Sequence, residues 1–526
     1  MIDPELAHAA AKAEAALATG RADGYDFMVA ALGRNARGDS TSAETLFARA
    51  RDLAPGDPAV LTGFAQFLRQ QGRLREAVEV CDAAIRAEPG YADAWIERGT
   101  ILSGGGSDRA AGESFARALA LAPRAAVAHA GLAAIAAKNG AAELVREHAR
   151  VALAIDGTNV VAAASLARVE IEAGQPAAAL DLLRPMVARM PEPSNDRSLA
   201  WSLIGDAHDK LDECPAAFAA HAQSKADFGA ANAAPAQTVM RHSAFVKAIT
   251  AGLEAMPAVR WSEDRGGAVS GQASVHVFLL GYPRSGTTLI ENVLASLPGV
   301  AALEERPTLS TADTAVLAGD AASIVDRLAA FAVADESEIV PWRQAYWNKV
   351  IESGVPPGAT GFVDMDPLKG TRLPLIARLF PGAKLLRMMR DPRDVVWSCF
   401  RTHFAVTSNT LDFTTLEDTA WHYDALMRLI ALAEDRLPIV LHEVRYDRLV
   451  RDFDNETRAM CAAIGLPWNA AMRQFDRTAK ARGVATASVG QVRKGLYDGT
   501  RQWERYAEQL APVMPILAPW IERFGY

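Results

Sequence analysis

The fold of the second half of the chain is decided by the stretch Val275-His-Val-Phe-Leu-Leu-Gly281-Tyr-Pro-Arg284-Ser-Gly286-Thr-Thr-Leu-Ile-Glu-Asn-Val-Leu294. It begins as a short apolar run with β-branched residues, breaks at Gly and Pro, and continues with apolar residues at helical spacing. This order predicts a strand, a tight loop and a helix, with backbone N–H groups and a helix N-terminus arranged around an anion. The spacing Gly281-x4-Gly286 matches nucleotide-binding loops, but Thr287 stands where their lysine belongs. We therefore predict a phosphate-like ligand other than the β- and γ-phosphates of a nucleoside triphosphate.

The loop itself offers several candidate ligand-binding residues. Arg284 supplies the fixed positive charge, and its planar fork suits two contacts with phosphate or sulfonate oxygens. The residues that follow would add N–H and hydroxyl donors; they are Ser285, Gly286, Thr287 and Thr288.

A second candidate site lies in the stretch Arg387-Met-Met-Arg390-Asp-Pro-Arg-Asp-Val-Val-Trp-Ser398. We expect a strand up to Arg390 and a helix from Asp394, with Ser398 about one turn into that helix. Arg390 and Ser398 together could hold a second, separate phosphate. With a further strand expected at Pro438–Val444, the alternation of strands and helices predicts an α/β domain whose central parallel sheet carries the site at the carboxyl ends of its strands.

The first half of the chain is periodic. Helix breakers recur at intervals of 34 residues, at Pro55, Pro89, Pro123, Gly157 and Pro191. This period, with small residues where helices must approach closely, resembles the tetratricopeptide repeat. We expect an all-α solenoid of about six units between Gly24 and Phe228 after a capping helix, so that residues 1–235 form a repeat array and residues 236–526 the α/β domain. The concave face of such an array suits a peptide or protein partner.

The amino-acid composition excludes several classes of protein. Charged residues make up 22% of the 526 and the formal net charge is −8, which argues against general binding to nucleic acid or anionic membranes. The four cysteines are widely separated, so neither a disulfide framework nor a structural metal site is expected. No apolar run reaches membrane-spanning length and the first residues lack a signal-like pattern. We expect a cytoplasmic protein that needs no metal.

The two candidate sites together resemble the sulfotransferase superfamily, most closely its tyrosylprotein sulfotransferase branch. The resemblance runs from about Val275 to Tyr526. It implies PAPS (3′-phosphoadenosine 5′-phosphosulfate) as the sulfuryl donor, with the first loop on the 5′-phosphosulfate and Arg390 with Ser398 on the 3′-phosphate. By position from Arg284, the catalytic base would be Glu305 of the pair Glu304-Glu305. The resemblance also implies three further donor contacts, which are Tyr446, Ser488 and Lys494.

One position departs from the pattern of that branch. Asp364-Met365-Asp366-Pro367 has methionine where the branch has a lysine that assists the departing phosphate. Lys369 or Arg284 could supply the charge instead; otherwise the chain would be an inactive tetratricopeptide scaffold.

Two different enzyme mechanisms are also compatible with the sequence. The loop fits an NTP-dependent kinase, against which the missing lysine counts, and His403 or His422 could replace Glu305 as the base. The acceptor could be a peptide, a glycan, a lipid or a small phenol.

Overall fold

The computed structural model describes residues 4–233, 237, 239–257, 269–482, 492–493 and 495–526. The chain divides into two compact units, Met1–Arg189 and Met190–Tyr526. The domain boundary at residue 235 was placed from the repeat pattern, whereas the division at residue 189 follows from compactness, so the boundary at residue 235 remains a prediction. Among the described residues, no helix combines the length and apolar character that crossing a bilayer requires.

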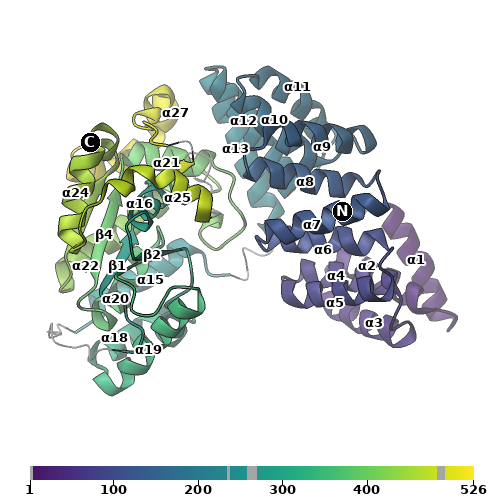
Figure 1. Cartoon of the computed structure of the whole chain (residues 1–526), viewed down its shortest axis with the longest axis horizontal. Helices are drawn as coiled ribbons and strands as arrows, with labels where there is room; N and C mark the ends of the chain where they lie inside the picture. Colours follow the sequence, from purple (N-terminus) through teal and green to yellow (C-terminus); the bar gives the residue numbers. More distant parts are fainter. Residues whose placement is uncertain (1–3, 234–236, 238, 258–268, 483–491, 494) are drawn as a thin grey trace. The chain divides into compact units, whose positions relative to one another are not determined.

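The first unit is a series of helix pairs that follow a leading helix (Figure 1). Its helices are α1 (Pro4–Ala18), α2 (Gly24–Ala36), α3 (Ser40–Leu53), α4 (Pro58–Gln70), α5 (Leu74–Ala87), α6 (Ala92–Gly104), α7 (Asp108–Leu121), α8 (Ala126–Lys138), α9 (Ala142–Ile155), α10 (Val160–Glu172) and α11 (Pro176–Ala188). The second helix of each pair ends just before one of the predicted breakers. The predicted all-α solenoid is confirmed.

A second periodic signal lies in the turn inside each pair. Glycines with positive φ close these turns at Gly38, Gly72, Gly106, Gly140 and Gly174. A side chain at such a φ is strained, so glycine recurs with the repeat. The sixth pair, α12 (Asn195–Lys210) and α13 (Cys214–Ala231), uses Asp212 at φ 61° in this turn.

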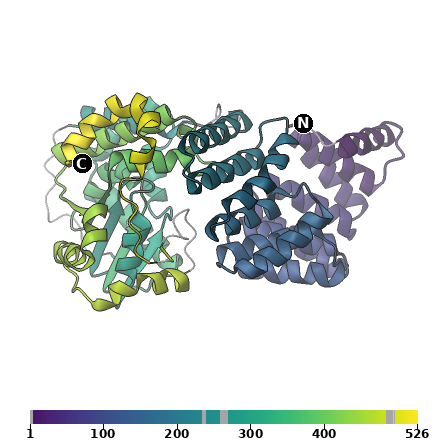
Figure 2. The same cartoon turned by 90° about the horizontal axis from the view of Figure 1, so that it is seen from above.

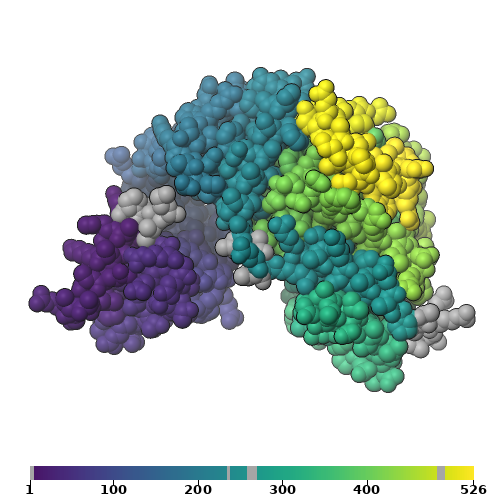
Figure 3. All heavy atoms as spheres, turned by 180° about the vertical axis from the view of Figure 1, so that it is seen from behind, coloured from purple at the N-terminus to yellow at the C-terminus, as the bar shows by residue number. Residues whose placement is uncertain are grey.

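The sixth pair belongs to the second unit, where it packs against α21 (Pro392–Arg401). The ring of Phe218 stacks on that of Trp397 with centroids 5.9 Å apart. The ammonium group of Lys225 donates to the carbonyl oxygen of Thr402, which caps the end of α21, at 2.8 Å. Asp209 accepts from Arg505 at 2.8 Å, and Figure 3 shows the yellow C-terminal segment beside these teal helices.

The second unit is built on a five-stranded parallel sheet in the order β2-β3-β1-β4-β5. Its strands are β1 (Val275–Leu280), β2 (Val300–Glu304), β3 (Gly361–Met365), β4 (Lys384–Met389) and β5 (Leu441–Arg445). β1 is the central strand, between β3 and β4. The loop that follows β1 lies at the carboxyl edge of the sheet, where ligands bind in parallel α/β sheets. The predicted parallel sheet is confirmed, although its last strand begins at Leu441, three residues after Pro438. Proline donates no ladder hydrogen bond, and Ile439 N turns back to Leu437 O at 2.8 Å.

Helices cover both faces of the sheet (Figure 2), and alternate residues of β1 enter two apolar clusters. Val277 and Leu279 face one cluster, while Phe278 and Leu280 face the other. Besides α12 and α13, the described residues of this unit form α15 (His242–Ala255), α16 (Thr287–Ala295), α17 (Ser310–Ala312), α18 (Ala321–Val333), α19 (Glu336–Glu352), α20 (Leu373–Leu379), α21, α22 (Leu416–Arg436), α23 (Tyr446–Arg451), α24 (Phe453–Ile464), α25 (Phe475–Arg482), α27 (Ala507–Leu510) and α28 (Met514–Phe524). Buried on both faces, the sheet holds its carboxyl edge in a fixed position.

Candidate active site

The loop between β1 and α16 has the shape that its sequence predicts. Gly286 precedes the first residue of α16 at φ 113°. A Cβ atom there would lie 2.9 Å from Met388 Cε and 3.1 Å from the Tyr446 ring. Ser285, Thr287 and the neighbouring Thr288 are all buried around this turn. The close backbone approach and the helix N-terminus fit a phosphate or sulfonate group.

Arg284 joins the two phosphate sites that the sequence predicts as separate. Its Nε donates to Ser398 Oγ at 3.1 Å, and its carbonyl oxygen accepts from Arg390 at 2.9 Å. Burial lowers the pKa of the Arg284 guanidinium to about 10, which still leaves it cationic at neutral pH. Arg284, Ser398 and Arg390 therefore form one continuous cationic and polar group at the loop.

Arg390 also contacts the late part of the chain. Its guanidinium lies 4.9 Å from the centroid of the Tyr446 ring and donates to Gly499 O at 2.5 Å. The Tyr446 hydroxyl donates to Tyr497 O at 2.5 Å. The backbone of residues 497–499 thus accepts hydrogen bonds from Arg390 and Tyr446, two of the residues predicted to bind the sulfuryl donor. Ser488 and Lys494 lie outside the described residues.

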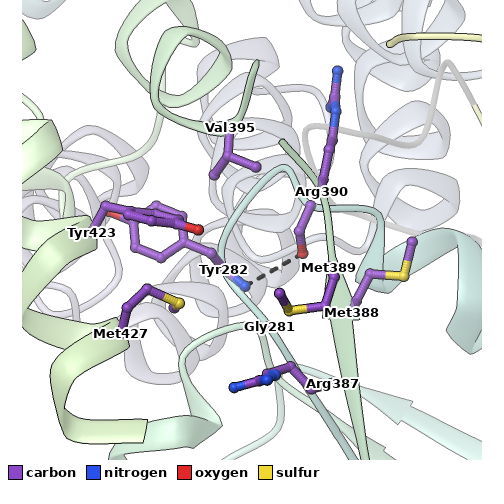
Figure 4. Close-up of a pocket in the computed structure, with 10 residues that line it drawn as sticks. Gly281, Tyr282, Arg387, Met388, Met389, Arg390, Val395, Tyr423 and Met427 are labelled. Atoms are coloured by element: carbon purple, nitrogen blue, oxygen red, sulfur yellow. Dashed lines mark hydrogen bonds between the residues drawn. The ribbon is translucent and has the colours of Figure 1, made fainter. Parts of the chain in front are cut away.

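A small hollow lies behind the loop, between the ends of β1 and β4 and helix α22 (Figure 4). Arg387 and Arg390 both line it, yet their guanidinium groups point in different directions, that of Arg390 upward in the view and that of Arg387 to the left (Figure 4). Arg387 pairs with Glu434 at 3.1 Å and also with Glu443. Arg387 therefore belongs to a structural ion-pair group and is not part of the site that contains Arg390.

Glu305 is the first residue after β2 and has a positive φ of 49°. Its N–H donates to Met365 O at 2.8 Å, while Gly281 N of the loop donates to Pro367 O at 3.1 Å. The short segment Met365–Pro367, at the end of β3, therefore contacts Glu305 through one residue and the loop through another.

The environment of Glu305 suits a base. The residue is exposed, so an acceptor can reach it. The protein crowded around it displaces water and raises the pKa of its carboxyl to about 7; like charge from Asp366, Glu304 and Glu291 acts in the same direction. Arg284 and Glu305 are also two of the four non-glycine residues with positive φ among those described. Such backbone is concentrated at functional sites.

The structure distinguishes the two cations that could replace the missing lysine. Lys369 is buried and forms an ion pair with Asp364, which also accepts from Tyr346 at 2.9 Å. Met365, one residue later on β3, faces the opposite apolar cluster. Arg284 is therefore the cation that lies in the loop.

Of the two candidate histidine bases, His422 is buried and His403 is half-buried. Tyr282 hydroxyl and His422 Nδ1 lie 2.6 Å apart, and His422 Nε2 lies 2.8 Å from His242 Nδ1. Burial lowers the pKa of His422 well below its usual value. The His403 ring lies edge-on to Phe228 at 6.2 Å. Neither histidine is among the groups that shift the pKa of Glu305.

Sequence reasoning missed the residues that act on the site from a distance. Asp366 and Glu291 bring like charge to Glu305, and Gly499 supplies a carbonyl to Arg390. The only sequence signal is the position of Asp366, which follows Met365 at the end of a strand. Among the described residues, no three His, Cys, Asp or Glu side chains are grouped so as to hold a metal ion.

Comparison with known proteins bears on both halves of the chain. Residues 276–470 match the sulfotransferase family. The sulfotransferase region contains the loop, Glu305, Arg390 and Ser398, and residues 35–96 match the tetratricopeptide repeat. The predicted resemblance is confirmed at both places.

Two relatives illustrate the extent of the similarity. An uncharacterized protein of Aquifex aeolicus is 31% identical over 253 residues, covering 46% of this chain and 32% of that protein. Protein-tyrosine sulfotransferase 1 of Danio rerio is 26% identical over 272 residues, covering 48% of this chain and 72% of that protein. The chain thus spans about a third of the Aquifex relative, and the alignment with the sulfotransferase covers about half of the chain.

Proposed function

We propose that this protein is a PAPS-dependent sulfotransferase that moves a sulfuryl group to an acceptor hydroxyl, with protein tyrosine as the acceptor. The observation that carries the proposal is the joining of Arg284, Ser398 and Arg390 at one loop, with Glu305 held across the end of β3. The acceptor is inferred from the relatives named protein-tyrosine sulfotransferase, which cover 48% of this chain.

The residues divide into two roles. Arg390 and Ser398 would hold the 3′-phosphate, while Arg284 and the N–H groups at the start of α16 would hold the 5′-phosphosulfate oxygens. When bound, PAPS supplies an activated sulfuryl group. Glu305, as carboxylate, would take the proton from the acceptor hydroxyl as its oxygen attacks sulfur. The tetratricopeptide array would bind the acceptor protein or a separate protein partner.

The test measures donor binding and transfer separately. Purified full chain is incubated with labelled PAPS and tyrosine-containing peptides, and binding of 3′,5′-adenosine bisphosphate is followed by calorimetry. We expect Arg390→Ala to weaken that binding by about tenfold to a hundredfold, because charge-assisted hydrogen bonds are lost. Glu305→Gln should keep the binding and lose most of the transfer. The exposed Arg451, which pairs with Asp447 at 3.5 Å, provides the control variant Arg451→Ala.

Two outcomes would reject the proposal. One is absence of both bisphosphate binding and transfer to every acceptor tried. The other is thermal stabilisation by ATP with magnesium and none by the bisphosphate, which would favour a kinase.

A further inference from the structure

Residues 497–506 form a strap that connects Arg390 with helix α12 of the last repeat pair. At its first end, Gly499 O accepts from the Arg390 guanidinium at 2.5 Å. A Cβ atom at Gly499 would lie 3.3 Å from both Arg390 Nη2 and Tyr446 Oη, so the backbone approaches these side chains closely. The strap therefore fixes one side of the Arg390 guanidinium.

The middle of the strap is tied to the first turn of α21. Asp394 is 1% exposed, and its two carboxylate oxygens accept from Arg501 N and Trp503 N, each at 2.9 Å. These bonds hold the start of a short 3₁₀-helix, Gln502–Tyr506. The Arg393 guanidinium lies 3.9 Å from the centroid of the Trp503 ring. The short helix thus leaves the start of α21 in a fixed direction.

The far end of the strap is held by a carboxylate of α12. Arg505 donates to Asp209 Oδ1 at 2.8 Å, and the Tyr506 hydroxyl donates to the same oxygen. Arg401, the last residue of α21, donates to Asp209 Oδ2 at 3.3 Å. Burial of Asp209 opposes its ionisation, but its neighbours outweigh burial and hold the pKa of the carboxyl below its usual value. Asp209 is therefore a carboxylate that joins the strap to the end of α21.

Both elements that Asp209 contacts carry a residue of the proposed 3′-phosphate site. The strap holds Arg390 through Gly499, and α21 carries Ser398 about one turn before Arg401. A group that binds an anion tightly must be held in place by its neighbours, because loose side chains lose affinity when they are ordered. One residue of the repeat array thus supports this part of the site from the side away from the ligand.

We propose that Asp209 is a positioning residue for the 3′-phosphate site: it holds the strap so that Gly499 keeps Arg390 in place. This inference rests on the proposed function, in which Arg390 binds the 3′-phosphate. Asp209 acts through the strap and needs no contact with the donor. The last repeat pair is then a part of the donor site as well as of the array.

The test compares two ligands that differ only in the 3′-phosphate. Calorimetry on the full chain gives the affinities for 3′,5′-adenosine bisphosphate and for 5′-adenosine monophosphate, and their ratio reports on the 3′-phosphate site alone. Asp209→Asn removes the charge with little change in size. We expect it to lower the ratio about fivefold and to leave the affinity for the monophosphate unchanged. A general loss of folded protein would weaken both ligands alike.

Two single variants accompany it. Asp212→Asn is the matched control, because Asp212 is exposed and pairs with Arg505 at 2.8 Å but not with Arg401 or Tyr506; the ratio should stay at the wild-type value. Arg505→Gln breaks the contact with Asp209 from the exposed side. It should lower the ratio in the same direction, and it decides the question if Asp209→Asn yields too little folded protein.

A double variant tests whether Asp209 acts through Arg390. In Arg390→Ala the side chain that the strap holds is missing, so adding Asp209→Asn should have little further effect on the ratio.

The outcomes separate this inference from the proposed function. A wild-type ratio in Asp209→Asn, an equal fall in Asp212→Asn, or a full effect of Asp209→Asn on top of Arg390→Ala would overturn the inference. A wild-type protein that binds both adenosine phosphates equally would instead reject the proposed 3′-phosphate site. If the wild type prefers the bisphosphate and Asp209→Asn keeps that preference in full, only this inference fails.

Discussion

Replacing Lys225 by methionine should make the protein more stable at neutral pH and change how its stability depends on pH. Lys225 is 5% exposed, and the ring centroids of Phe228 and Phe404 lie 6.0 Å and 5.6 Å from its nitrogen. Its ammonium group donates a hydrogen bond to Thr402 O at 2.8 Å. Burial lowers the pKa of this ammonium from 10.5 to about 8.

The size of the effect follows from that shift. At about 1.4 kcal/mol per pKa unit, holding the charged form in the folded state costs roughly 3 kcal/mol at pH 7. Methionine removes this cost and loses one hydrogen bond of about 1 kcal/mol. We therefore expect Lys225→Met to raise the free energy of unfolding by about 2 kcal/mol at pH 7, as buried charges replaced by apolar groups often do.

The sign of the pH dependence is the sharper test. Between pH 8 and pH 10.5 the unfolded chain binds more protons at Lys225 than the folded chain, so wild-type stability gains with rising pH there. Lys225→Met lacks this gain, and the two proteins should converge. Urea unfolding from pH 7 to pH 10 measures the difference, with Lys210→Met on the exposed side of α12 as control. A difference between wild type and Lys225→Met that stays constant over this range would refute the reasoning.

Three further outcomes are expected. Gly286 has a φ of 113°, so Gly286→Ala should weaken binding of 3′,5′-adenosine bisphosphate at least about tenfold, as measured by calorimetry. The control variant Gly382→Ala should leave that binding unchanged, because a Cβ atom at Gly382 meets nothing within 4 Å. In the proposed mechanism Glu305 acts as a carboxylate, and burial raises its pKa to about 7, so kcat should rise with pH through neutrality; an acid limb near pH 4.5 would contradict this. A fragment of residues 190–526 should be soluble and monomeric by gel filtration. A fragment of residues 236–526 should aggregate, because removing α13 uncovers the apolar face of α21. If both fragments elute in the same way, the packing of α13 on α21 does not keep the second unit soluble.

Local patterns were sufficient for the repeats and for the loop. The breakers from Pro55 to Pro191 mark helix ends because these residues disfavour continuation of an α-helix, so the second helix of each pair ends just before one of them. The loop from Gly281 to Gly286 was recognisable because its glycines and donors are consecutive.

Contacts between distant residues could not be read in the same way. Lys369 was a candidate cation in the sequence, but its pairing with Asp364 depends on which face of β3 Asp364 occupies and on the turn after the strand that brings Lys369 back to it. The contact between Arg284 and Ser398 joins residues 114 positions apart. The positive φ of Glu305 has no sequence signal, since glutamate rarely adopts that conformation.

The packing of α12 and α13 sets a limit on how this chain can vary in length. The pairs from α2 to α11 repeat at an interval that their turn glycines fix, so whole repeats could be gained or lost there while each remaining pair keeps equivalent neighbours. The sixth pair is different, because Asp209 and Lys225 have individual partners at Arg505 and Thr402. Related chains should therefore differ in the number of repeats before Arg189 and retain the last pair as a fixed part of the second unit.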